Sequence, residues 1–72
     1  MNFKLYDVVV LMEDLPHENL HKGAIGAIVE ILDEGVLLVE FADADGQTVE
    51  MLDLRASQLM KVFYEPMREA AA

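Results

Sequence analysis

The spacing of two histidines, His17 and His21, gives the sequence its clearest candidate for chemistry. With Glu18 they form His-Glu-x-x-His, the signature of zinc metalloproteases. That chemistry needs both histidines one helical turn apart, a third metal ligand and the glutamate beside a metal-bound water. Pro16 precedes the motif and Gly23 closely follows it, and the chain has no third histidine and no cysteine. We therefore predict an exposed loop without metal, cofactor or catalytic residues, with a metal-dependent hydrolase using His17 and His21 as an alternative.

Two shorter motifs favour structure over ligand binding. The Asp-x-Asp-Gly run at 43–46 resembles part of an EF-hand loop, but Leu52 stands where the closing glutamate belongs. The Gly-x-x-Gly run at 23–26 has the form of the KH-domain loop, yet its flanks favour strands where that loop joins helices. The sequence therefore predicts a hairpin turn at the first motif and a structural glycine pair at the second.

Composition limits the classes of partner. Fourteen acidic residues against five basic ones give a net charge of -9, and no basic patch is visible. A surface of this sign repels DNA and RNA. The chain shows no signal-peptide pattern, no apolar run long enough to span a bilayer and no cysteine for a disulfide. We expect a cytoplasmic protein that binds neither nucleic acid nor membrane.

Turn residues divide the 72-residue chain into short, β-branched segments. Residues 55–59 are too few for a stable helix and suit a single 3₁₀ turn. The sequence thus predicts an all-β fold, a small five-stranded SH3-like barrel with one 3₁₀ turn before the last strand. The barrel domain is expected at 1–64 and a flexible C-terminal tail at 65–72. The expected strands are 3–12, 24–32, 36–42, 47–54 and 60–64.

Several residues are expected to shape the turns. Gly26 opens the second strand, where glycine relieves crowding if another segment passes close to the backbone. Gly35 is the expected positive-φ residue of a short turn. Leu15 and Leu20 are expected to fold the polar loop back and plug one end of the barrel. The predicted structural positions are Gly23, Gly26, Gly35, Gly46 and Pro16.

The order of several short motifs resembles a known family. Phe3–Leu11 is followed by Asp14–Pro16, Leu20–Gly26 and Ile28–Glu30, and later by Val39–Phe41 and a turn at 43–48. Over residues 3–62 this order resembles domain of unknown function 4926, a family of small bacterial proteins frequent in cyanobacteria. The resemblance implies an SH3-like barrel and no catalytic residues.

A more distant likeness leaves a second function open. The loop–Gly–x–x–Gly–x–Ile piece looks like the KOW element of ribosomal and transcription proteins. A KOW-like, nucleic-acid-associated domain is therefore an alternative, although the basic residues of such RNA binders are absent here.

Two apolar runs predict association. Val8–Leu11 and Val36–Val39 are apolar throughout, whereas a strand covered on one face should alternate. Left bare, one face would form a larger apolar patch than a monomer usually exposes. We therefore expect a homodimer or a protein partner, covering a surface that includes Val9, Leu11, Val36, Leu38, Tyr6 and Tyr64.

Together these features predict a non-enzymatic, acidic protein-interaction module. One concrete form is a small antitoxin-like subunit that masks a larger protein, for which the negative charge suits a basic partner. Tyr6, Phe63 and Tyr64 are alternatively an aromatic shelf of the kind with which SH3 domains bind proline-rich peptides.

Overall fold

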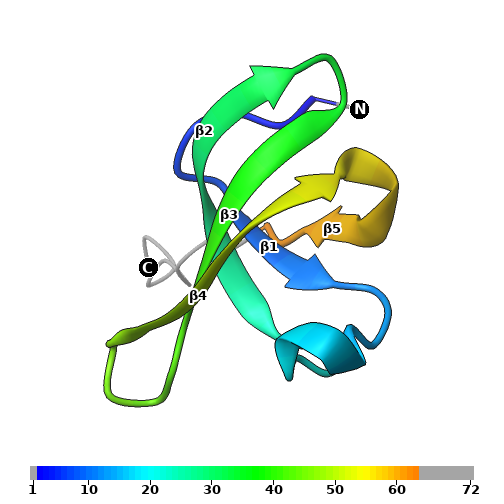
Figure 1. Cartoon of the computed structure of the whole chain (residues 1–72). Helices are drawn as coiled ribbons and strands as arrows, with labels where there is room; N and C mark the ends of the chain where they lie inside the picture. The colour runs from blue at the N-terminus through cyan, green and yellow to red at the C-terminus, as the bar shows by residue number, and fades with distance from the viewer. Residues whose placement is uncertain (1, 64–72) are drawn as a thin grey trace, which may run out of the picture.

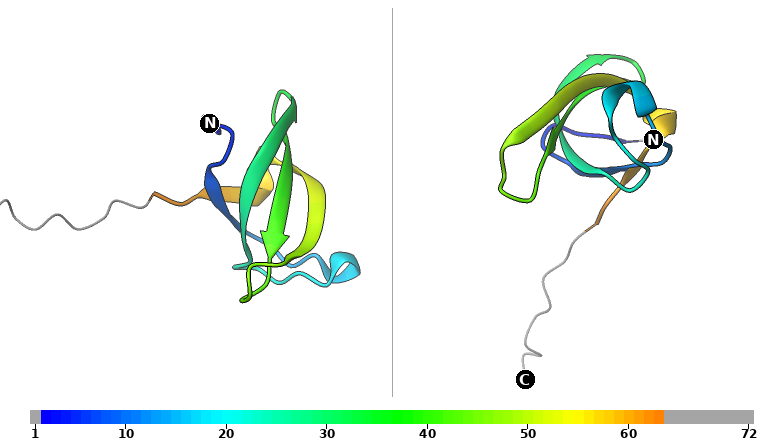
Figure 2. Two further views of the ribbon diagram at one scale, coloured as in Figure 1. Left: turned by 90° about the vertical axis from the view of Figure 1, so that its left-hand side faces the viewer. Right: turned by 60° about the horizontal axis from the view of Figure 1, so that its bottom comes forward.

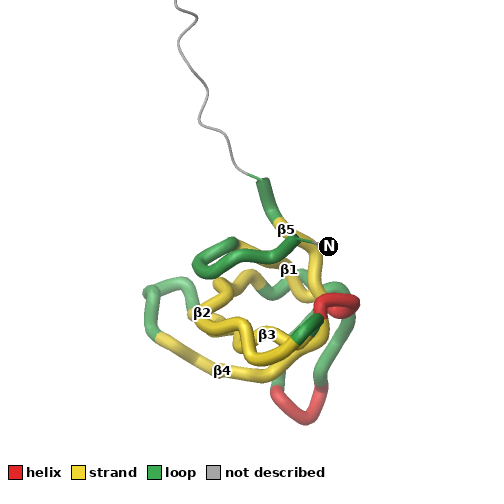
Figure 3. The backbone as a smooth tube through the Cα atoms, turned by 90° about the horizontal axis from the view of Figure 1, so that it is seen from above, coloured by secondary structure: helices red, strands yellow, loops and turns green. Residues whose placement is uncertain are grey.

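Five antiparallel strands form one sheet that curls into an SH3-like barrel (Figure 1). The computed structural model describes residues 2–63. The strand order β4-β3-β2-β1-β5 places β1 between its sequence neighbour β2 and the distant β5. Viewed from above, β1 and β5 lie on one side and β3 and β4 on the other, with β2 between them (Figure 3). The strands are β1 Val8–Leu11, β2 Ile25–Asp33, β3 Val36–Ala42, β4 Thr48–Arg55 and β5 Leu59–Lys61.

The connections between strands confirm the predicted turns and add one. The 3₁₀ turn before the last strand is η2, Ala56–Gln58, and Gly35 has the predicted positive φ, at 75°. An unpredicted 3₁₀ turn, η1 (Pro16–Glu18), lies in the loop after β1, which projects from one end of the barrel (Figure 2). Leu15 and Leu20 close this loop with two backbone hydrogen bonds of 2.8 and 3.2 Å. Leu20 is buried, so the loop does fold back as predicted.

The first strand is shorter than predicted because a tight turn occupies its first residues. The Asp7 N–H donates to the Lys4 carbonyl (3.1 Å), and the Asp7 carboxylate accepts from the Lys4 N–H (2.8 Å). Local hydrogen bonds from an aspartate side chain compete with strand pairing in this way, so regular pairing starts at Val8. At the other end, β5 stops at Lys61, and Tyr64 and the predicted tail at 65–72 lie outside the described residues.

The barrel interior is a single apolar cluster with contributions from every strand. On β3, Leu37, Val39 and Phe41 alternate with outward residues and point inward. Burying these side chains is the main favourable term for so short a chain. The buried set is Val9, Leu11, Leu20, Ile28, Leu37, Val39, Phe41, Leu54 and Leu59.

The prediction that Val9 and Leu11 lie on the outer face was wrong. Both side chains are 0% exposed and belong to the core, whereas Val8 is 43% exposed and Val10 is half-buried. In a run of four apolar residues the alternation of the strand is invisible, and a shift of one residue exchanges the two faces.

The prediction that Val36 and Leu38 of β3 lie on the outer face is correct, unlike that for β1. Val36 and Leu38 alternate with the buried residues and do lie on its outer side. Both are only half-buried, however, so they expose less apolar surface than expected.

The backbone of β2 approaches β3 closely at Gly26. A Cβ atom at this position would lie 2.8 Å from the Glu40 carbonyl oxygen, 2.8 Å from Val39 Cγ1 and 3.0 Å from Phe41 Cδ1. Those distances are shorter than real Cβ contacts, so only glycine fits without displacing β3. The predicted close approach at Gly26 is therefore present.

Replacing Gly26 by alanine is expected to destabilise the barrel. The added methyl overpacks the β2–β3 contact, which should lower the free energy of unfolding by about 1–3 kcal/mol. Urea denaturation followed by circular dichroism measures this. Ala42→Ser, an exposed β3 position, serves as control and should leave the midpoint nearly unchanged. An unchanged midpoint for Gly26→Ala would show that β3 yields to the methyl without cost.

The Lys4–Asp7 turn is joined to the last strand through the Asp7 carboxylate. Lys61 Nζ lies 3.2 Å from Asp7 Oδ2, the atom that also accepts from the Lys4 N–H. The backbone hydrogen bond from Lys4, followed by the charge and hydrogen bond of Lys61, lowers the pKa of Asp7 below its ordinary value of 3.8. The ionised carboxylate is therefore the form that the folded chain favours.

Acid is expected to weaken this junction. Because the folded-state pKa lies below the unfolded one, the stabilisation is present above about pH 4 and is lost as the pH falls through the folded-state pKa. Asp7→Asn should lower the urea midpoint at neutral pH, and the gap to the parent should shrink in acid. Asp45→Asn, in an exposed turn, is the control and should show no such convergence. A gap that stays constant with pH would mean that the Asp7 charge contributes nothing.

Candidate functional site

Six uncharged side chains form two cross-strand rows on the outside of β2, β1 and β5; we call them the outer apolar face. In one row, Val10 pairs with Ile25 on one side and Met60 on the other. In the next, Val8 pairs with Ala27, and its carbonyl accepts from the Val62 N–H at 2.9 Å. Residues opposite each other on antiparallel strands have adjoining side chains. The members are Val8, Val10, Ile25, Ala27, Met60 and Val62.

The outer apolar face is exposed to solvent. Ile25 is 62% exposed, Met60 51% and Val8 43%, while Val10, Ala27 and Val62 are half-buried. Single exposed apolar residues are ordinary, but a contiguous group of them marks a surface for association.

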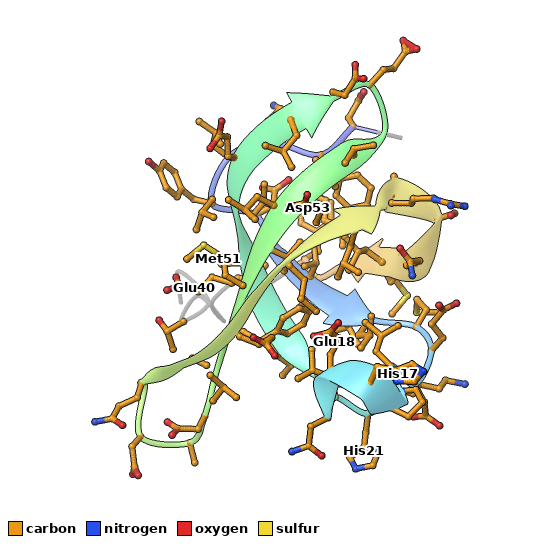
Figure 4. The ribbon with its side chains drawn as sticks, in the orientation of Figure 1. His17, Glu18, His21, Glu40, Met51 and Asp53 are labelled. Carbon is orange, nitrogen blue, oxygen red and sulfur yellow. The ribbon has the colours of Figure 1, made fainter. Side chains whose placement is uncertain are left out.

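Carboxylates border this face on the β3 and β4 side. Glu40 of β3 pairs with Ala27 of β2 on one side and with Met51 of β4 on the other. Figure 4 shows Glu40 and Met51 next to each other. One row further, Leu38 separates Glu30 of β2 from Asp53 of β4. Glu40 is held in place because its carboxylate accepts a hydrogen bond from the Thr48 hydroxyl. The sheet thus presents an apolar half beside a half in which these carboxylates stand among exposed apolar side chains, Val49 and Met51.

An open hollow on another side of the barrel is lined mainly by polar groups. The Gln58 side chain crosses it, donating to Glu13 Oε2 (3.0 Å) and accepting from the Arg55 N–H (2.8 Å). The bond to Glu13 fastens η2 to the loop after β1, whereas the bond from Arg55 caps η2 itself. Ser57 has no histidine among the lining residues. The lining residues are Glu13, Val36, Asp53, Leu54, Arg55, Ser57 and Gln58.

The His-Glu-x-x-His motif does not form a helix. Its first residues lie in the three-residue η1, and Asn19 adopts the left-handed conformation that ends the turn. His21 is directed away from His17 and Glu18 (Figure 4), and its Nδ1 lies 3.9 Å from Asp14 Oδ1. Within residues 2–63 no group of three or more His, Cys, Asp or Glu side chains is placed to hold a metal ion.

The remaining predicted positions are spread over the barrel. Pro16 is the first residue of η1, where its fixed φ suits a turn. Gly23 and Gly46 have positive φ. Tyr6 and Phe63 are both strongly exposed, while Tyr64 lies outside the described residues, so an aromatic shelf of the three stays a prediction. No helix in the described part of the chain is long and apolar enough to cross a membrane.

Sequence reasoning missed the residues that dominate the outer apolar face. Ile25 and Met60 lie where a strand begins or is very short, so neither stands in a visible alternation. One usable signal was Gly26. A side chain at Gly26 would point into the core, against Val39 and Phe41. Because side chains alternate along a strand, the neighbouring Ile25 points outward. The strand register then places Val10, opposite Ile25, outside as well.

The two histidines are expected to be dispensable for folding. His17→Ala with His21→Ala removes exposed side chains, so the urea midpoint should stay within the error of the parent. Elemental analysis of untagged protein should find no stoichiometric zinc in either form. One zinc per chain in the parent, lost together with stability in the double variant, would restore the metal-site hypothesis.

Comparison with known proteins places the chain in a family without assigning it a function. The family described as "Domain of unknown function (DUF4926)" matches residues 5–61. No curated protein and no solved structure matches.

Proposed function

Because the chain belongs to the DUF4926 family, whose function is unknown, we propose from its surface that it is a non-enzymatic protein-interaction module that binds a basic protein. The observation that carries the proposal is the outer apolar face, with Ile25 and Met60 more than half exposed. A small barrel that leaves part of two apolar rows exposed to solvent gains free energy when a partner covers them.

Charge complementarity supports a basic protein as the partner. The chain has a net charge of -9, and Glu40 lies directly beside the apolar rows. A basic protein would be attracted at long range and oriented so that its cations meet these carboxylates. A second copy of the chain would bring equal charges together. Masking a larger basic protein, in the manner of an antitoxin, is one form that such binding would take.

The alternative functions gain no support from the surface. A metal-dependent hydrolase needs His17 and His21 on one helical face, and the chain gives them a three-residue turn that ends at Asn19. A KOW-like domain needs cations for phosphate, whereas Glu40 lies beside the outer apolar face and Glu30 lies one row further along β2.

Introducing positive charge on the outer apolar face tests the proposal. The tagged chain is used to recover partners from its source cells, and each protein identified is purified and titrated against the parent and a double variant, Ile25→Lys with Met60→Lys. Lysines on the outer apolar face remove apolar contact and repel a basic partner, so affinity should fall by about tenfold or more. Glu34→Lys, in the exposed turn between β2 and β3, raises the net charge by the same two units and is the matched control, which should bind within about twofold of the parent.

Three results would contradict the proposal. The first is a partner with an acidic surface. The second is an equal loss of affinity in the Glu34→Lys control. The third is a homodimer of the isolated chain in sedimentation analysis that the Ile25→Lys change dissociates, which would make the face a self-interface.

A further inference from the structure

A tyrosine occupies a strained position at one end of the outer apolar face. The Lys4–Asp7 turn brings Tyr6 to φ 71°, in the left-handed region. The Asp7 N–H to Lys4 carbonyl bond closes the turn around Leu5 and Tyr6, and positive φ at the third residue is the geometry of a type II turn. Glycine or asparagine is normal there, whereas a bulky residue is an outlier.

The strain is not repaid by burial of the ring. Tyr6 is 75% exposed, so its ring gains little from the hydrophobic effect. A glycine at the same place would adopt the turn without strain. Strained residues persist where the surrounding structure fixes them, and they cluster at functional sites.

Several hydrogen bonds hold the turn in a single position. The Tyr6 N–H donates to the Ile28 carbonyl at 2.7 Å, and the Ile28 N–H donates to the Asp7 carbonyl at 3.0 Å. The Asp7 carboxylate is bound in turn by the Lys4 N–H and by Lys61 Nζ. These contacts fix the turn against Ile28 of β2 and Lys61 of β5. Tyr6 is therefore held two residues before Val8, a member of the outer apolar face.

We propose that Tyr6 is an aromatic anchor of the binding surface, extending the outer apolar face toward an amphipathic basic segment of the partner. This rests on the proposed function. Apolar side chains of the segment contact the Tyr6 ring and Val8, and its cations reach Glu30 and Glu40. Tyrosine is among the residues that contribute most to interfaces. A ring whose backbone is already fixed loses little entropy on binding.

Tyrosine fluorescence gives a direct readout. The chain has two tyrosines and no tryptophan, so a Tyr64→Phe background leaves Tyr6 as the single reporter. The probe is an eight-residue peptide of alternating lysine and valine. Control peptides alternate lysine with serine, which keeps the charge and removes the apolar residues, or glutamate with valine, which keeps the apolar residues and reverses the charge. We expect the lysine–valine peptide to change Tyr6 emission and to bind at least about fivefold more tightly than either control.

Substitution at Tyr6 separates a binding role from a structural one. Tyr6→Gly and Tyr6→Asn should keep or raise the urea midpoint, because both residues adopt a positive φ with less strain than tyrosine. Both should lower the affinity for the lysine–valine peptide about tenfold, measured by calorimetry. Tyr6→Phe should bind nearly as the parent does. Val49→Ser, which removes an exposed valine from β4, is the control and should change neither property.

Each other outcome is decisive. A lower urea midpoint in Tyr6→Gly would make the ring a structural element and overturn the inference. Unchanged peptide affinity in Tyr6→Gly, with affinity lost in Ile25→Lys, would overturn the inference and leave the proposed function standing. No difference between the lysine–valine and control peptides on the parent would overturn both.

Discussion

The approach of β2 to β3 at Gly26 is the constraint on which the rest of the barrel depends. A strand bearing any other side chain there would be pushed away from Val39 and Phe41, two of the largest fully buried residues. Because Gly26 also pairs with Val9 of β1, its position fixes which way the side chains of three strands point. The core and the outer apolar face are therefore two results of one register.

Much of the fold could be predicted from the sequence because turns carry local signals. Gly35 and the aspartate–glycine turn at 43–46 mark hairpin ends, and Leu37, Val39 and Phe41 alternate with Leu38 and Glu40 in a strand that has the predicted bounds. The first strand failed where a local signal competed, since the Asp7 side chain bonds to the Lys4 N–H. The same carboxylate also pairs with Lys61, a contact that no local pattern reveals because Lys61 is far away in the sequence.

The outer apolar face was harder to predict than the core. A face exists only through pairing, and Ile25, Val10 and Met60 come together across three strands. The run Val8–Leu11 gives no hint of which residues face outward, so its two inward members were assigned to the surface. Strain is equally hidden from sequence reasoning, because nothing in the letters around Tyr6 announces a positive φ.

The contrast between the two halves of the sheet explains how a small acidic chain tolerates an apolar surface. Glu30, Glu40 and Asp53 stand on the β2–β4 side of the apolar rows. Their charge opposes contact between copies of the chain and favours contact with a basic protein. Specificity of this kind comes from repulsion of the wrong partner as much as from attraction of the right one.

The shortness of β5 couples the surface to local opening of the fold. This strand has three residues, Leu59–Lys61, and pairs with β1 within the described chain. It also supplies Met60, so a transient detachment of β5 would dismantle part of the outer apolar face while the longer β2–β3–β4 meander stays paired. A partner seated on that face would bind only the closed form and would shift the equilibrium toward it. Amide hydrogens of β1 and β5 would then exchange with solvent more slowly in the complex than in the free chain.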